Sequence, residues 1–188
     1  MALRMAVLVA VAVAWAGEAR ALVVEPVTLD QLARESDAVV SGTVEAVASR
    51  YDDAPATGRI VTDVTVRVDR VARGADEGPQ LVFTLPGGIV AGRGQRVPGI
   101  PTVRAGDELV VFMAPPALTA RGARRAPIAL SLGMFFVTRG DDRPARAEQR
   151  LGGVAVRELG VHPAEPLSID LDELLARVRA LPATGGQP

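Results

Sequence analysis

The sequence predicts a mainly β protein, a small antiparallel barrel of five or six strands with a short N-terminal helix and a C-terminal helix. Three observations support this fold class. Residues 38–49 and 60–71 alternate between apolar and polar side chains, as strands with one buried face do. Turns rich in glycine and proline separate several shorter apolar runs. Helical spacing of apolar residues is clear at 28–35 and 170–181.

The first 21 residues have the organisation of a cleavable secretory signal peptide. Arg4 precedes an apolar run over residues 5–16, and Ala19 and Ala21 supply the small side chains that a signal peptidase recognises. The apolar run is shorter than the roughly 20 residues that a membrane-spanning helix needs. We therefore expect cleavage after Ala21, a secreted or periplasmic product and no stable membrane span. An uncleaved N-terminal anchor is the alternative.

Composition limits the chemistry of the remaining chain. Residues 22–181 are expected to form one domain, because their number suits a single hydrophobic core. The chain has no cysteine, which excludes disulfides, thiolate catalysis and a lipoprotein anchor, and no lysine, which excludes a Schiff base. Its net charge of -1 and its 3% of aromatic residues argue against a nucleic-acid partner.

The N-terminal elements follow from local signals. Thr28 and Gln31 have the spacing of a capping box and predict a helix over 28–35. The two long alternating segments, 38–49 and 60–71, predict an antiparallel pair of strands, each with one mostly polar face. The loop between these strands contains the acidic pair Asp52 and Asp53.

Shorter strands are expected at 80–85 and 108–114. The unbroken apolar run 109–113 indicates a strand buried on both faces. Between these strands, residues 89–104 hold so many glycines and prolines that no regular element is expected, and 115–127 is expected to be a second loop.

The C-terminal half predicts three further strands and a helix. Strands are expected at 128–132 and 134–139, with a bend at Gly133, and a weaker one at 145–151. Asp170 and Glu173 predict a capped helix that ends at Pro182. Residues 182–188 are expected to form a disordered tail.

Three segments carry a resemblance to a known group of proteins: 36–44 (SDAVVSGTV), 64–74 (VTVRVDRVARG) and 105–112 (AGDELVVF). They resemble small exported bacterial proteins that are similar to the OB-fold barrel of tissue-inhibitor-of-metalloproteinase and netrin-like domains. The resemblance covers residues 37–138 and implies an OB-like barrel. The inhibitors chelate zinc through an N-terminal cysteine, which this chain lacks, so their activity is not implied here.

No combination of residues matches a known catalytic or metal-binding motif. His162 is the only histidine and precedes a proline in a late loop. Ser41 and Ser131 lack the frame of a nucleophile elbow. The acidic pairs at 52–53 and 141–142 lack the spacing of a calcium loop. We therefore expect no cofactor and no metal, and we interpret these residues as surface or turn residues.

The glycine-rich stretch 86–101 is the best candidate for a contact surface. It has no phosphate-binding motif, but long irregular loops on rigid scaffolds often carry binding sites. The expected binding residues on and beside this loop are Gly92, Arg93, Gly94, Arg96, Arg104 and Tyr51. Arginines 121, 124 and 125 stand on a second loop. The alternative for all these arginines is pairing with neighbouring acids, or solvation.

The sequence therefore favours an exported, non-enzymatic binding module whose partner is a protein or an envelope component. One alternative is a hydrolase or metal-dependent enzyme that uses scattered carboxylates and His162. Another is a structural surface protein attached through its C-terminal tail, where residues 181–185 spell a sortase recognition site but no apolar segment follows. The oligomeric state stays open.

Overall fold

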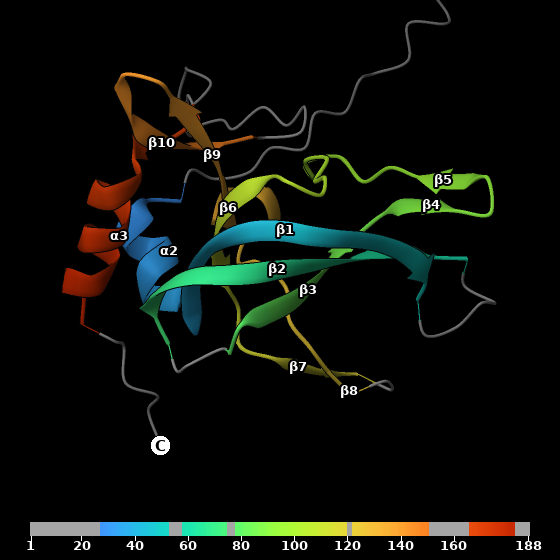
Figure 1. Ribbon diagram of the computed structural model, residues 1–188. Coiled ribbons are helices and arrows are strands. Elements are labelled where there is room, and N and C mark those ends of the chain that lie inside the picture. The colour runs from blue at the N-terminus through green and yellow to red at the C-terminus, as the bar shows by residue number, and fades with distance from the viewer. Residues whose placement is uncertain (1–26, 53–57, 75–77, 120–121, 151–165, 183–188) are drawn as a thin grey trace, which may run out of the picture.

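A curved antiparallel sheet dominates the computed structural model, which describes residues 27–52, 58–74, 78–119, 122–150 and 166–182 (Figure 1). Within these residues the sheet has seven strands in the order β11-β10-β9-β6-β1-β2-β3. The mainly β class is thereby confirmed. The strands are β1 (Ala38–Tyr51), β2 (Ile60–Arg73), β3 (Gln80–Pro86), β6 (Glu108–Met113), β9 (Met134–Gly140), β10 (Arg143–Gln149) and β11 (Ser168–Asp170).

The sheet is not a closed barrel. In the described part of the chain, β3 and β11 are its terminal strands and do not pair with each other. The chain uses β9, β10 and β11 to extend the sheet beyond β6, so the last strands move away from β3 instead of returning to it. The described part of the sheet has seven strands, whereas five or six were predicted, because β9, β10 and β11 extend the sheet on the far side of β6.

The sheet separates two hydrophobic cores, and β6 contributes to both. Leu109 and Val111 pack on one side with residues of β1, β2, β3 and β9. Val110 and Phe112 pack on the other side, beneath the two helices. All four side chains are fully buried. The burial of both faces of this strand, predicted from its unbroken apolar run, is confirmed.

Strand β1 differs from its prediction in its first half. The predicted polar face begins with Val39 and Ser41, and both are buried. Val39 belongs to the core beneath the helices. Alternation indicates a solvated face only where nothing covers it, and here the core residues of the two helices cover this face of β1 at Val39.

The helices are α2 (Leu29–Glu35) and α3 (Leu171–Ala180), and Figure 1 shows them side by side against one end of the sheet. Thr28 forms the predicted capping box, with its hydroxyl accepting from the Gln31 backbone N–H at 3.2 Å. The carboxylate of Asp170 accepts from two backbone N–H groups at the start of α3. Both predicted helices are confirmed.

The segment predicted as a strand at 128–132 is instead a turn that ends in a short 3-10 helix, η2 (Leu130–Gly133). Ala129 and Leu130 adopt positive φ angles of 46° and 53°. A Cβ added at Gly133 would lie 2.2 Å from the Ile128 carbonyl oxygen, so the chain folds tightly back on itself there. The following strand, β9, matches its prediction, and its partner β10 is found two residues earlier in the chain than the predicted strand at 145–151.

Two short hairpins occupy the segments that were expected to be irregular. They are β4 (Gly88–Val90) with β5 (Arg93–Gln95), and β7 (Ala117–Thr119) with β8 (Gly122–Arg124). In Figure 1 the β4–β5 hairpin runs along the end of β1 that is far from the helices. The predicted signal peptide, His162 and almost all of the predicted C-terminal tail lie outside the described residues.

Candidate functional site

An open groove of about 640 Å³ lies between the β4–β5 hairpin and the ends of the first three strands. Its walls come from the hairpin, from the strand ends and from the loop that leads toward β6. Most of its lining is apolar. The lining residues are Val47, Ser49, Thr62, Leu85, Pro86, Gly87, Gly88, Ile89, Gly94, Gln95, Arg96, Val97, Ile100, Pro101, Thr102 and Val103.

Two hydroxyl groups attach the hairpin to the sheet at the base of the groove. Ser49 on β1 and Thr62 on β2 are cross-strand partners, and their hydroxyl oxygens lie 2.9 Å apart. Thr62 donates to the Gly87 carbonyl oxygen at 2.7 Å, and Ser49 accepts from the Ile89 backbone N–H at 3.3 Å. The base of the groove is therefore a connected polar network.

Glycine is required where the hairpin meets these hydroxyls. Gly88 has a φ of +136°, and a Cβ at this position would lie 2.4 Å from both the Ser49 and the Thr62 hydroxyl oxygens. Contacts that short do not occur between a real Cβ and a neighbouring atom. The absence of a side chain at Gly88 therefore lets the hairpin sit directly on the two strands.

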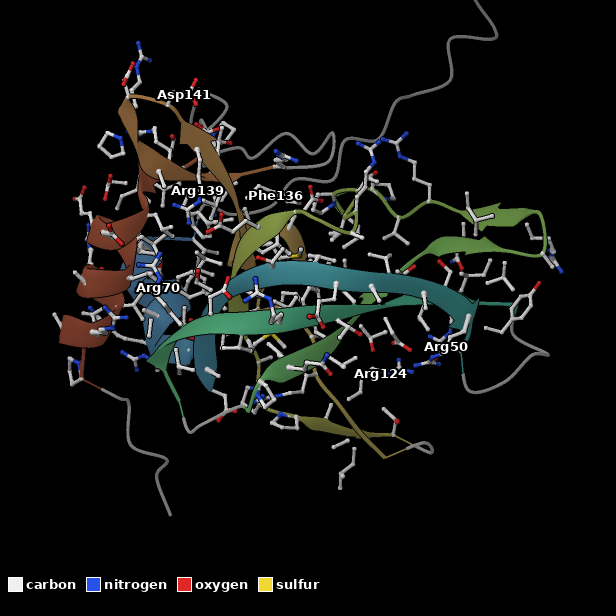
Figure 2. The ribbon with its side chains drawn as sticks, in the orientation of Figure 1. Arg50, Arg70, Arg124, Phe136, Arg139 and Asp141 are labelled. Carbon is white, nitrogen blue, oxygen red and sulfur yellow. The ribbon has the colours of Figure 1, made fainter. Side chains whose placement is uncertain are left out.

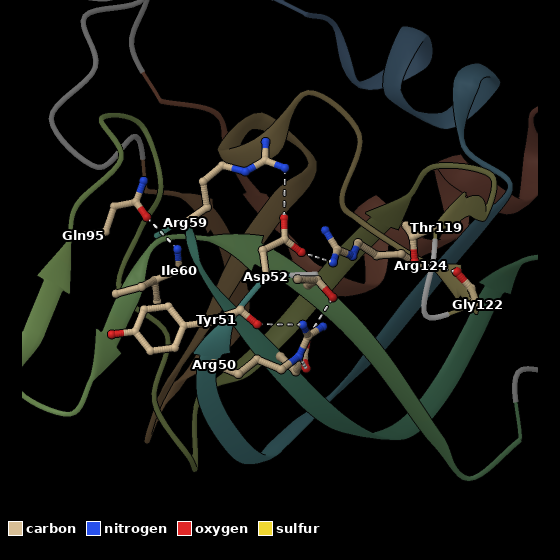
Figure 3. Close-up of polar contacts among 11 residues, drawn as sticks. Arg50, Tyr51, Asp52, Arg59, Ile60, Gln95, Thr119, Gly122 and Arg124 are labelled. Carbon is tan, nitrogen blue, oxygen red and sulfur yellow. Dashed lines mark hydrogen bonds and ion pairs between the residues drawn. The ribbon is translucent and has the colours of Figure 1, made fainter. Parts of the chain in front are cut away.

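The hairpin itself turns through Ala91 and Gly92, which both have positive φ angles, 48° and 79°. A two-residue loop with two positive φ angles is a type I′ turn. The Gln95 side chain then holds β5 in place, because its carbonyl oxygen accepts from the Ile60 backbone N–H at 2.7 Å (Figure 3). The expectation of an irregular loop failed because alanine is an unusual first residue for this turn.

The structure brings some of the predicted binding residues to the groove and leaves others outside it. Gly94 and Arg96 line it. Gly92 and Arg93 lie at the exposed tip of the hairpin. Arg104 lies outside the lining, in a turn where its backbone N–H donates to Asp107 at 2.7 Å. Tyr51, half-buried at the end of β1, is also outside the lining.

The sequence reasoning missed Ser49, Thr62 and Val47. All three belong to segments that were correctly predicted as strands. Ser49 and Thr62 looked like ordinary polar positions on a solvated face, because no local signal reports that a hairpin packs on them. The available signal was the pairing of the two strands, which places these hydroxyls opposite each other.

The arginines near the hairpin differ from most others in the structure. Arg93, Arg96 and Arg104 are exposed, and within the described residues their side chains form no ion pair or hydrogen bond. On the second predicted loop, by contrast, Arg124 pairs with Asp52 and Arg125 pairs with Asp37 at 2.7 Å. Arg121 lies outside the described residues.

A cluster of ion pairs stabilises the far end of β1 and β2 (Figures 2 and 3). The buried carboxylate of Asp52 accepts from Arg124 at 2.5 Å and lies 3.3 Å from Arg59. Asp63 accepts from Arg50 at 2.6 Å and from the Thr84 hydroxyl at 2.7 Å. Because Arg124 is on β8, this cluster joins the β7–β8 hairpin to the sheet.

Asp63 has an altered pKa within this cluster. Partial burial alone would raise the pKa, since it disfavours the charged form. The hydrogen bonds from Arg50 and Thr84, together with the positive charges of Arg50 and Arg124, outweigh that effect. The pKa of Asp63 is therefore below its ordinary value, and the carboxylate is charged at neutral pH.

The described residues contain no group of three or more His, Cys, Asp or Glu side chains that could hold a metal ion. Ser41 and Ser131 are almost completely buried, so neither hydroxyl is accessible to a substrate. His162, which the enzyme alternative invoked, lies outside the described part of the chain, and so does Asp53 of the first acidic pair. No helix within the described residues has both the length and the apolar character to cross a membrane.

Comparisons of the chain with protein-family models, with curated proteins and with solved structures found no match.

Proposed function

We propose that this chain is an exported, non-enzymatic binding module, and that the groove beside the β4–β5 hairpin is its binding site. The observation that carries the proposal is the groove itself, which lies at the glycine-rich loop that the sequence singles out as a contact surface. Its volume of about 640 Å³ is within the roughly 300–1,000 Å³ that is usual for binding clefts. The partner is a protein or an envelope component.

The hydrogen bonds that fix the walls of the groove, and its mostly apolar lining, support a binding role. Its base is held by the hydroxyls of Ser49 and Thr62, and its hairpin wall is fixed by Gln95. A site whose walls are fixed before binding loses little conformational entropy when the partner arrives. Apolar side chains with a few oriented polar groups are also the usual lining of such sites.

An OB-like arrangement is part of the proposal. The Thr84 backbone N–H donates to the Arg125 carbonyl oxygen at 2.9 Å, and the Ala114 N–H donates to the Ala126 carbonyl oxygen at 2.9 Å. Residues 125–126 thus lie between β3 and β6. We interpret the order β1, β2, β3, residues 125–126 and β6 as a partly open OB-like barrel, a scaffold that binds ligands on its strand face and in its loops.

Export through cleavage after Ala21 belongs to the same proposal and has its own test. Cells that produce the full chain are fractionated, and the N-terminus of the released protein is sequenced. Release into the periplasm or medium with Leu22 as the first residue supports the proposal. Retention of the uncleaved chain in the membrane fraction contradicts it.

Two matched valine substitutions test the binding site. Val47, on β1, lines the groove and is 38% exposed, whereas Val82, on β3, is 51% exposed and lies outside the lining. Val47→Arg introduces a large charged side chain at the groove, and Val82→Arg introduces the same side chain elsewhere on the same sheet.

Chemical cross-linking of the mature protein to envelope extract gives the readout. A partner that the wild-type and Val82→Arg proteins capture equally, and that Val47→Arg captures at least about tenfold less, places binding at the groove; a tenfold change corresponds to about 1.4 kcal/mol. Equal capture by all three folded proteins, checked by circular dichroism, shows that the groove is not the site.

A further inference from the structure

The outer edge of β5 presents an unused strand edge beside the groove. A two-residue hairpin loop closes on a hydrogen-bonded pair, here Val90 and Arg93, and such pairs alternate along the ladder. Ile89 and Gly94 therefore form a non-hydrogen-bonded pair, whose N–H and C=O groups point away from the hairpin. The Ile89 N–H follows this pattern, because it donates outward to the Ser49 hydroxyl.

On the other side of the hairpin, the corresponding groups of Gly94 have no partner among the described residues. Among the described residues, no backbone hydrogen bond outside the β4–β5 ladder involves Gly94. Gly94 also has no side chain on the face that it shares with Ile89, where the atom nearest to an added Cβ is Cγ1 of Ile89 at 3.8 Å. A side chain of an added strand can therefore lie over Gly94 and reach Ile89.

A third strand would complete this hairpin. Two-stranded ribbons are marginally stable on their own, and an extended peptide that adds to a free edge supplies the missing main-chain hydrogen bonds. Ile89 lies opposite Gly94 in the ribbon and is 71% exposed. It offers an apolar contact to alternate side chains of an added strand.

The charges on the same edge indicate which peptides would bind. Arg93 directly precedes Gly94 and Arg96 follows it by two residues; both are exposed and contact no carboxylate within the described residues. Arg50, Arg139 and Arg177, elsewhere on the surface, each pair with an acid. Two unpaired guanidinium groups beside a free strand edge are complementary to an acidic segment.

We propose that an extended acidic peptide segment of a partner protein adds to β5 as a third strand, with its alternate apolar side chains against Ile89 and the groove. The proposal rests on the proposed function and names the partner class of that site. The outward N–H and C=O of Gly94 bind the peptide backbone, and Arg93 and Arg96 bind its carboxylates.

A pair of defined peptides tests this proposal. The probe is a capped heptapeptide of alternating glutamate and valine, and its control is the same peptide with lysine in place of glutamate. Each is titrated into the isotope-labelled mature protein and followed by NMR. We expect the acidic peptide to shift the amide signals of residues 93–97, with binding that weakens as salt is added, and the basic peptide to leave them unchanged.

Two variants separate strand addition from simple charge attraction. Gly94→Pro replaces the outward N–H donor with the proline ring, and it leaves the hydrogen bonds of the β4–β5 ladder in place because this N–H is not part of them. Proline is tolerated on an edge strand where its nitrogen faces solvent. We expect it to reduce binding of the acidic peptide at least about tenfold, equal to about 1.4 kcal/mol. Arg143→Gln removes an exposed arginine on a different strand, β10, and should leave binding unchanged.

Binding of the acidic peptide by Gly94→Pro as strong as by the wild-type protein overturns strand addition, provided that the Gly94→Pro spectrum shows an intact fold. No shift at residues 93–97, or equal binding of the basic peptide, also overturns it. In these cases a partner that depends on Val47 but not on Val82 would still support the groove as the binding site, so the two proposals fail separately.

Discussion

Adding one methyl group at Gly88 tests how closely the β4–β5 hairpin packs on the sheet. In Gly88→Ala the new Cβ would lie 2.4 Å from the hydroxyl oxygens of Ser49 and Thr62, at a φ of +136°. A positive φ costs an L-residue about 1–2 kcal/mol. Overpacking costs about 1–3 kcal/mol more. We expect the free energy of unfolding to fall by about 2–5 kcal/mol.

The clash can be relieved only by loss of the contacts that hold the hairpin. Thr62 donates to Gly87 at 2.7 Å, and Ile89 donates to Ser49 at 3.3 Å. At about 0.5–1.5 kcal/mol each, these two bonds limit the packing part of the loss to about 1–3 kcal/mol. Because the domain cores are far larger than this contact, the protein stays folded.

Gly92→Ala is the matched control. Gly92 also has a positive φ, +79°, but no atom lies within 4 Å of an added Cβ. Gly92→Ala should lower the free energy of unfolding only by the cost of the positive φ angle, about 1–2 kcal/mol. Urea unfolding followed by circular dichroism measures both variants. Equal losses for Gly88→Ala and Gly92→Ala would refute the packing argument, and so would unchanged hydrogen exchange at the Ile89 amide of Gly88→Ala.

Two further predictions concern the rest of the scaffold. Because the pKa of folded Asp63 is below its ordinary value near 3.8, its ion pair with Arg50 stabilises the protein above that pH and is lost as the pH falls through the folded pKa. The stability difference between wild-type and Asp63→Asn proteins should therefore shrink as urea titrations move from pH 6 toward about pH 3; a constant difference would contradict the role of the carboxylate. Phe112→Ala removes a fully buried ring whose centroid lies 5.6 Å from that of Phe135. Thermal and urea unfolding should show that the free energy of unfolding falls by about 3–5 kcal/mol. A loss below about 1 kcal/mol would mean that the core beneath the helices is loosely packed.

The elements that the sequence predicted well are those with a local cause. The capping pair Thr28 and Gln31 begins α2, and Asp170 begins α3, because side chains one turn away satisfy the free N–H groups. The run 109–113 is apolar at every position, so either face of β6 would expose apolar side chains if it were left in water, and both faces are buried. In each case the information lies within a few residues of the element.

The errors arose where distant contacts decide the structure. Ile128 and its neighbours have the composition of a strand, yet the close approach of Gly133 to the Ile128 carbonyl bends them into a turn. Closure of the sheet depends on whether the last strands return to β3, and no local pattern specifies that. The hairpin turn has the usual glycine at its second position, Gly92, but Ala91 replaces the usual asparagine, aspartate or glycine at the first, so the turn signal is incomplete.

Only part of the candidate site could be predicted, because some of its residues come together through contacts between distant parts of the chain. The glycine-rich loop was identified by composition, and two of the predicted binding residues, Gly94 and Arg96, line the groove. The hydroxyls of Ser49 and Thr62 escaped notice because their role depends on a hairpin that packs on them. Arg104 and Tyr51 are near the loop in sequence, but the fold places both outside the lining.

The position of β6 between two cores has a consequence for the order in which the chain can assemble. β1 and β2 are close in sequence and can pair early. The other edge of β1 can pair only after β6 has formed, and the partner residues on β6 are about 70 positions later in the chain. Until Val111 and Phe112 have been synthesised, Val40 and Val39 have no neighbour on that edge. A nascent chain of this length exposes an unpaired apolar strand, the kind of surface to which chaperones bind and at which chains aggregate.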